Sequence, residues 1–395
     1  MLGNILINKI SLVISFIYVN LLLKPILKMF TMNKIFLLLL IVFVSNTIFT
    51  KNGMSQINTN VLQDTIKVLT KKDKQLAEKK YNQGVIMLQS NKFQESIALF
   101  DEAIKIKTKF PEAFYNRAAA KFEMNNYVGA IQDYNYAIIL TQTSKYYLAR
   151  GIAKYKYKEY KGALRDFQEA INIDSTNMEY VSESYYYNGC VNFEMKKYDN
   201  AISAYSMAIK KNPNYAFAYH DRGSCYRMTE KYQEALTDYR KAIQINPSMA
   251  IAFNNMGSVK KLLKDYQGAI TDYSSAISLD TAYYIAYNNR AIVFKELGKF
   301  DNAKEDFDNA IRVNPNYAIA YGNRGNLKFK KKEYEQAIGD YNKAIDLDPS
   351  YGYGFLNRGI CKEMLRDSEG ACKDWSKADE LGVAAAGNYL NAQCK

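Results

Sequence analysis

The sequence has few of the residues that build catalytic and metal sites. Its 395 residues include one histidine, five cysteines, six prolines and one tryptophan. A single histidine and irregularly spaced cysteines do not supply the ligand set of a zinc module. No glycine-rich phosphate loop occurs, and the neighbours His220 and Asp221 have no partnered nucleophile. We therefore predict no enzyme activity, no metal or other cofactor, and no small-molecule substrate.

What the sequence does contain is a recurring motif. The pattern Gly-x(11)-Ala-x(3)-aromatic-x(2)-Ala returns nine times, and all but two of the steps are 34 residues long. The small residues that open it are Gly84, Ala118, Gly151, Gly189, Gly223, Gly257, Ala291, Gly325 and Gly359. A fixed period of this length predicts stacked units rather than one globular core. The 38-residue step before Gly189 adds about one helical turn, which predicts a lengthened helix or a local bend within 175–182.

Each repeat has the pattern of two antiparallel helices. If the opening small residue is position 8, position 20 is alanine in all repeats but the first, and position 27 is alanine in all nine. Positions 4 and 24 carry aromatic residues in nearly every repeat. Small residues permit close helix approach, and the aromatic rings fill the space beside them. Proline closes four repeats, because it lacks a donor and ends the second helix.

The motif resembles the tetratricopeptide repeat at nearly every signature position, over about three-quarters of the chain. The resemblance implies an all-α fold, a right-handed α-solenoid of nine helical hairpins over 77–382. Residues 56–76 are then a linker and lead-in helix, and residues 383–395 are a C-terminal capping helix. A solenoid needs such a cap to cover its last apolar face.

The N-terminal segment 1–55 has the composition of a targeting region. An uncharged apolar run over 35–50 follows Lys34, as in a signal peptide. Cleavage after the small-x-small triplet at 53–55 would make Gln56 the N-terminus of the mature protein. The alternative is a membrane anchor. A second apolar stretch over 10–23 allows a two-helix membrane hairpin, unless translation starts at Met32.

This region predicts an exported protein of bacterial type, located in the periplasm or cell envelope or anchored in the membrane. No cysteine precedes Cys190, which excludes an N-terminal lipoprotein anchor. The net charge of the whole chain is +13. Lysines in the turns within the repeats form a basic ridge that could meet anionic lipids or acidic proteins, although such a row is often only a solvated face. We predict no nucleic-acid partner, since no base-stacking motif accompanies the lysines.

Charged residues at positions 7 and 23 vary together. Repeats with arginine at position 7 have aspartate at position 23, whereas Gln83 and Asn188 occur with Leu99 and Ala204. We predict salt bridges within repeats, the alternative being independent surface charges. The pairs are Arg117–Asp133, Arg150–Asp166, Arg222–Asp238, Arg290–Asp306, Arg324–Asp340 and Arg358–Asp374. Met256, which occurs with Asp272, is the exception.

The resemblance implies that the first helix of each repeat lines a concave groove, with positions 2, 5, 6 and 9 directed into it. Position 6 is asparagine in six repeats, similar to the asparagine ladder of O-linked N-acetylglucosamine transferase. An amide can pair with a peptide unit without reading its side chains. The predicted peptide-binding residues are Asn116, His220, Asp221, Asn254, Asn255, Asn288, Asn289, Asn323 and Asn357. The alternative is that these asparagines belong to the repeat consensus and solvate the groove.

The positions of two cysteines suggest a disulfide near the C-terminus. Cys372 lies ten residues before Gly382 and Cys394 twelve after it, so the two face each other in a hairpin that turns there. We predict a Cys372–Cys394 disulfide in an oxidising compartment, and Cys361–Cys372 is the rival pairing.

The predicted function is a non-enzymatic scaffold that binds an extended peptide or partner helix in the groove. The alternative is an architectural subunit of an envelope assembly, tethered to the membrane or not, that uses its outer surface.

Overall fold

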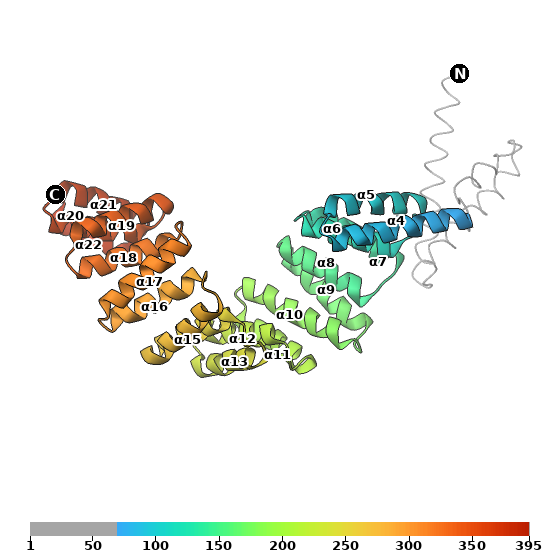
Figure 1. Cartoon of the computed structure of the whole chain (residues 1–395), viewed down its shortest axis with the longest axis horizontal. Coiled ribbons are helices and arrows are strands. Elements are labelled where there is room, and N and C mark those ends of the chain that lie inside the picture. Colours follow the sequence, from blue (N-terminus) through green and yellow to red (C-terminus); the bar gives the residue numbers. More distant parts are fainter. Residues whose placement is uncertain (1–68, 395) are drawn as a thin grey trace, which may run out of the picture. The chain divides into compact units, whose positions relative to one another are not determined.

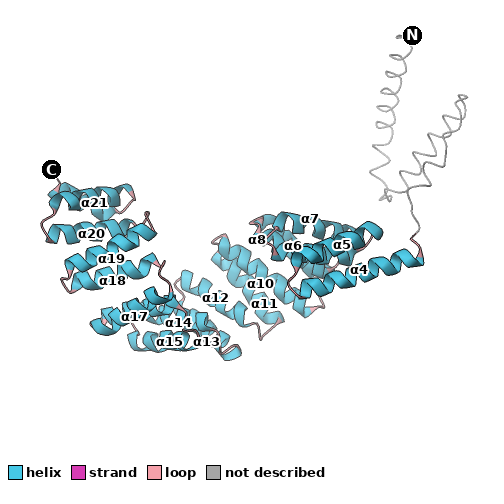
Figure 2. Ribbon diagram, turned by 45° about the horizontal axis from the view of Figure 1, so that its top comes forward, coloured by secondary structure: helices cyan, strands magenta, loops and turns pink. Residues whose placement is uncertain are grey.

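The computed structural model describes residues 69–394, and these residues are helical throughout, with short connecting loops and no strand (Figures 1 and 2). The predictions for residues 1–55 lie outside the described part. None of the helices within 69–394 combines the length and hydropathy of a transmembrane span.

Within residues 69–394, nine helical hairpins follow one another, and a last helix packs against the ninth. In each repeat the first helix is called helix A and the second helix B. The hairpins are α4 (Lys71–Gln89) with α5 (Phe93–Ile106), α6 (Pro111–Glu123) with α7 (Tyr127–Leu140), α8 (Ser144–Lys156) with α9 (Tyr160–Ile173), α10 (Met178–Glu194) with α11 (Tyr198–Lys211), α12 (Ala216–Met228) with α13 (Tyr232–Ile245), α14 (Ala250–Leu262) with α15 (Tyr266–Leu279), α16 (Tyr284–Glu296) with α17 (Phe300–Val313), α18 (Ala318–Lys330) with α19 (Tyr334–Leu347), and α20 (Gly352–Met364) with α21 (Ser368–Glu380).

The terminal helix is α22 (Ala384–Gln393), within the segment predicted to be the cap. It packs on α21 and covers the core of repeat 9. Helix α4 begins at Lys71, so the first hairpin starts six residues before the predicted boundary at residue 77. The all-α solenoid of paired helices is the fold that the sequence predicts.

The core of each hairpin forms around the aromatic residue at position 24. All nine of these rings are buried, and Tyr205, Phe307 and Trp375 are at most 1% exposed. The small residue at position 8 makes room for the ring, since a Cβ added to Gly189 would lie 2.5 Å from the Tyr205 ring. An aromatic side chain buries roughly 150–250 Å². The stack therefore gains one large buried ring per hairpin.

The 38-residue step lengthens a helix. α10 has 17 residues, whereas α12, which follows it as the next helix A, has 13. The additional turn lies at its N-terminal end, where α10 begins at Met178. Of the two outcomes predicted for this step, the structure has the longer helix.

The turn between helices A and B has one residue with positive φ in every repeat. In repeat 7 this residue is Gly298, with φ 72°, and in the other eight it is Asn91, Asn125, Lys158, Lys196, Glu230, Lys264, Lys332 and Arg366. Left-handed backbone costs a non-glycine residue about 1–2 kcal/mol. Eight of the nine turns thus keep a small strain that glycine would relieve.

We expect Gly298→Ala to lower the free energy of unfolding by about 1 kcal/mol. No atom lies within 4 Å of the added Cβ, so the loss reflects backbone conformation alone. Gly339→Ala is the matched control, because its Cβ also meets nothing within 4 Å but it lies inside helix α19. There alanine should add about 0.5–1 kcal/mol. Urea unfolding followed by circular dichroism measures both changes, and equal shifts for the two variants would contradict the explanation.

Candidate functional site

The helix A row forms the inner side of the stack. From repeat 4 to repeat 9, each helix A contacts the helix A of the next repeat, as α12 contacts α14 and α14 contacts α16. Within the described residues, no two successive B helices make comparable contact. The A helices are therefore the more closely spaced row, as on the inner side of a curved stack.

Hydrogen bonds connect position 6 of one repeat with position 5 of the preceding repeat. The amide Nδ2 of Asn289 donates to Asn254 Oδ1 at 3.0 Å, and Asn323 Nδ2 donates to Asn288 Oδ1 at 2.9 Å. Asn116 Nδ2 donates likewise to the hydroxyl of Tyr81 at 2.9 Å. The side chains that the sequence assigns to ligand contact thus join neighbouring repeats. We call this set of bonds the asparagine ladder.

Repeat 9 varies the ladder. Position 5 of repeat 8 is Gly322, which has no side-chain acceptor, so Asn357 Nδ2 donates to Asn326 Oδ1 at 2.9 Å. A Cβ on Gly322 would lie 2.6 Å from the hydroxyl of Tyr351. Glycine at position 5 therefore makes room for an aromatic ring, and the acceptor moves to position 9.

His220 and Asp221 belong to the same ladder. Tyr186 donates its hydroxyl to Asp221 Oδ2 at 2.9 Å, and the other Asp221 oxygen lies 2.7 Å from His220 Nδ1. His220 Nε2 lies 3.0 Å from Asn255 Nδ2. A carboxylate accepts and an amide N–H donates, so this arrangement requires the histidine tautomer with the proton on Nδ1. The pair that resembles a general base is held as a bridge between repeats.

Three residues of the predicted peptide-binding set are buried. His220, Asn254 and Asn288 are 6%, 4% and 2% exposed, because the next repeat covers position 5. The other six residues are half-buried: Asn116, Asp221, Asn255, Asn289, Asn323 and Asn357. The structure therefore divides the set into residues that face the neighbouring repeat and residues that remain accessible to a ligand.

The six predicted arginine–aspartate pairs are all in bidentate contact. In repeat 8, Arg324 Nε lies 2.9 Å from Asp340 Oδ2, and Nη2 lies 2.6 Å from Oδ1. The same two bonds occur in the other five pairs, at 2.5–2.8 Å. The hydrogen bond with Asp340 is the main cause that raises the pKa of Arg324.

A third bond of each arginine reaches the preceding repeat, which the sequence comparison did not predict. Nη1 contacts position 25 of that repeat, as Arg324 contacts Asp308 at 2.7 Å and Arg290 contacts Ser274 at 2.8 Å. This contact explains the exception at Met256. The position 25 residue that precedes Met256 is Arg240, so an arginine in place of Met256 would face a like charge. Arg240 instead acts electrostatically on Asp272.

Lysines at position 11 also contact the aspartate at position 23. Lys121, Lys154, Lys260, Lys328 and Lys362 place Nζ 2.7–2.9 Å from the aspartate of their own repeat. These lysines recur with the repeat period, so their contacts with the aspartates could have been predicted from the sequence. Their role depends on the helix B aspartate lying beside two successive turns of helix A.

Position 2 of helix A carries an exposed apolar row in the last five repeats. Phe217, Ile251, Ile319 and Tyr353 are 45–60% exposed, and Ile285 is half-buried. In repeats 1–4 the same position is Glu78, Glu112, Lys145 and Glu183. We call Phe217, Ile251, Ile285, Ile319 and Tyr353 the apolar row. Position 2 is among the predicted groove positions, but its change from charged to apolar residues after repeat 4 was not predicted.

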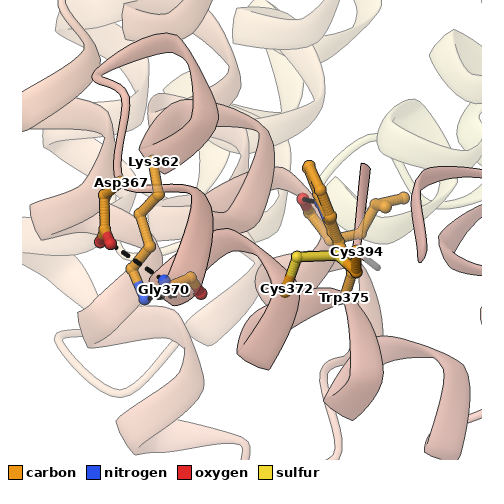
Figure 3. Close-up of a disulfide and its surroundings, with 7 residues drawn as sticks. Lys362, Asp367, Gly370, Cys372, Trp375 and Cys394 are labelled. Carbon is orange, nitrogen blue, oxygen red and sulfur yellow. Dashed lines mark hydrogen bonds between the residues drawn. A yellow bond between two sulfur atoms is a disulfide. The ribbon is translucent and has the colours of Figure 1, made fainter. Parts of the chain in front are cut away.

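Cys372 and Cys394 are joined by a disulfide (Figure 3). Cys361 is a free, buried thiol. The bond connects α21 with the end of α22, beside Trp375. Burial raises the pKa of the remaining thiols, Cys190, Cys225 and Cys361, to about 12 in each case. These thiols are therefore protonated and inert near neutral pH. Within 69–394, no group of three or more metal-ligating side chains is found.

Comparison with known proteins agrees with this architecture. Tetratricopeptide repeat models match residues 183–215, 216–249, 250–283, 284–317 and 318–351. No curated protein matches the chain. A tetratricopeptide repeat protein from Parabacteroides merdae ATCC 43184 has a similar crystal structure, with TM-score 0.53 and 20% identity over 64% of this chain and 100% of that one.

Two further solved structures are similar to this chain, with lower TM-scores. One comes from the functional characterisation of Pseudomonas aeruginosa pilF, with 20% identity, TM-score 0.49 and coverage of 55% of this chain and 99% of that one. The other is the C-terminal part of a repeat-containing protein from Cytophaga hutchinsonii, with 16% identity, TM-score 0.49 and coverage of 61% and 97%. The matched models show that residues 183–351 are tetratricopeptide repeats, and the stacked hairpins of the described residues share the fold of the solved tetratricopeptide repeat structure.

Proposed function

We propose that this protein is a non-enzymatic scaffold that binds an extended peptide segment of a partner protein along the helix A side of repeats 5–9. The tetratricopeptide fold is a scaffold for protein–protein interaction. The apolar row carries the proposal, because apolar side chains occupy the same position of helix A in five successive repeats and most of them are exposed. Such exposed apolar surface is typical of interaction sites.

The asparagine ladder supports an extended ligand. Asn289, Asn323 and Asn357 each use one N–H within the ladder, and their Oδ1 atoms accept no hydrogen bond from the described residues. Each amide thus keeps an acceptor and a donor for another molecule. An extended peptide has unpaired backbone groups that need such partners, whereas a helix satisfies most of its own. The ladder therefore favours an extended segment over a partner helix.

Substitution within the apolar row tests this function. We expect Ile251→Ser with Ile319→Ser to reduce partner capture by at least about tenfold, because a few central apolar contacts dominate most interfaces. Quantitative affinity capture from cell-envelope extract, with mass spectrometry, measures the loss for the full-length protein. The control is Ile139→Ser with Leu279→Ser, which removes exposed apolar side chains from B helices. If the two double variants lose the same partner equally, the inner side is not the binding surface.

A second candidate function is that of an architectural subunit that acts through its turn lysines. The observation in its favour is that Lys92, Lys158, Lys196, Lys231, Lys264, Lys299 and Lys332 are all exposed at the A–B turns. The capture experiment separates the candidates. Loss of the partner only when these lysines are changed to glutamate favours the architectural role.

Export of the chain is part of the proposal. Its support is the apolar run over 35–50 after Lys34, together with the Cys372–Cys394 disulfide, because disulfides persist mainly in oxidising compartments. N-terminal sequencing of the mature protein tests it. A chain that begins at Gln56 supports cleavage and export, and an intact chain in the membrane fraction supports the anchor. An intact chain in the cytoplasm contradicts both.

A further inference from the structure

Three cations occupy position 12 of helix A in successive repeats, and only one of them has a salt bridge with a described residue. Position 12 is Arg227 in repeat 5, Lys261 in repeat 6 and Lys295 in repeat 7. Arg227 and Lys261 form no salt bridge with any described residue, and the Nε of Arg227 is buried without a hydrogen-bond partner. We call these three residues the cation row. In repeats 1–4 the same position holds Leu88, Phe122, Tyr155 and Phe193.

The cation row is poorly neutralised compared with the other buried charges of the stack. Burial lowers the pKa of Lys261; Glu296 opposes this shift, and Lys295 adds to it. Glu296 itself contacts Lys295, with the two charged atoms 3.6 Å apart. Glu296 therefore acts on two cations, Lys261 and Lys295. By contrast, each arginine at position 7 has an aspartate in direct contact, although in four repeats that aspartate also contacts the lysine at position 11.

Helix periodicity places the three rows on one side of helix A. On a helix, positions 2, 6 and 12 share one side, within about 120° of each other. With a rise of 1.5 Å per residue, the asparagines at position 6 lie about 6 Å from the apolar row and about 9 Å from the cation row along the helix axis. An amide row thus runs between an apolar row and a positive row.

An extended peptide has the alternation that these rows require. Successive side chains of a strand point to opposite sides of its backbone. A backbone over the asparagines would direct one set of side chains to the apolar row and the other set to the cation row. The peptide units would then lie above the unpaired amide groups of the ladder.

We propose that the partner segment is an extended peptide in which apolar and acidic side chains alternate, the acidic ones facing Arg227, Lys261 and Lys295. This inference rests on the proposed function and specifies the chemistry of the partner. Neighbouring helices pack 8–10 Å apart, and a strand rises about 3.3 Å per residue. The apolar row would accordingly accommodate about 10–12 residues, with the acidic positions in the part that crosses repeats 5–7.

Synthetic peptides test the proposal directly. Three labelled twelve-residue probes alternate leucine with glutamate, leucine with lysine, and serine with glutamate, and fluorescence anisotropy with the full-length protein gives each Kd. We expect the leucine–glutamate peptide to bind at least about tenfold more tightly than either other peptide. In the variant Arg227→Gln, Lys261→Glu, Lys295→Glu, the preference for glutamate over lysine should disappear or reverse. Circular dichroism of that variant checks that the helices are retained.

The outcomes separate this inference from the proposed function. If both leucine peptides bind equally and Ile251→Ser with Ile319→Ser weakens both, the inner side binds peptides but the acidic preference is wrong. If the variant Arg227→Gln, Lys261→Glu, Lys295→Glu keeps the full preference for the glutamate peptide, the cation row does not contact the acidic side chains and the inference is wrong. If no probe binds, the inference is also overturned, while the capture experiment still decides the proposed function.

Discussion

Asp340→Ala is expected to lower the free energy of unfolding by about 3–4 kcal/mol, because removal of one member of a buried ion pair leaves the other charge uncompensated. The Asp340 side chain is 6% exposed and accepts from both Arg324 and Lys328, whose Nζ lies 2.9 Å away. Arg324 keeps its contact with Asp308, which places the effect at the lower end for a buried pair. Urea unfolding followed by circular dichroism measures the change.

The chain supplies its own control for this prediction. Repeat 4 has Asn188 and Ala204 at the positions of the pair and still forms its hairpin, α10 with α11. We expect Arg324→Asn combined with Asp340→Ala to recover part of the loss, because the uncompensated guanidinium is removed together with its partner. A double variant that is less stable than Asp340→Ala alone would show that the arginine stabilises the stack mainly through Asp308.

Cys394→Ser is expected to lower the stability of the C-terminal hairpin by about 3 kcal/mol. The disulfide closes a segment of 22 residues that contains the Leu381–Gly382 turn and all of α22. Its loss frees this segment in the unfolded chain and removes the bond that ties α22 to α21. Hydrogen exchange of the amides in α21 and α22 measures the local effect.

Reductant provides the matched comparison for the disulfide. The wild-type protein under reducing conditions should exchange these amides as fast as Cys394→Ser does, and the variant should not respond to reductant. The amides of repeats 1–7 should change little, because each repeat contacts chiefly its neighbours. Fast exchange throughout the stack would show that the cap stabilises the whole array.

The helical hairpins could be predicted from the sequence because the same pattern recurs in every repeat. Small residues at positions 8, 20 and 27 recur in nine registers, and one misread repeat would not have changed the result. The arginine–aspartate pairs were accessible for the same reason, since Asn188 and Ala204 depart from the pattern together. Repeats within one chain served as internal comparisons.

The contacts between repeats were less accessible, because they depend on how far helices shift against one another. The bond from Asn289 to Asn254 spans 35 residues, one more than the common repeat step, and only the stacking geometry reveals it. The same holds for Arg324 with Asp308. Asn254 and Asn288 were predicted to contact a ligand, but they are buried. The sequence alone does not distinguish an asparagine that faces a ligand from one that faces the neighbouring repeat.

Trp375 gives the chain a local optical probe. It is the single tryptophan of the sequence, is fully buried in repeat 9, and stacks on Tyr389 with ring centroids 4.9 Å apart. Its indole emission consequently follows the melting of the final hairpin alone, whereas ellipticity averages over every helix between residues 71 and 393. The separation between the two melting curves would measure how independently the end of this array comes apart.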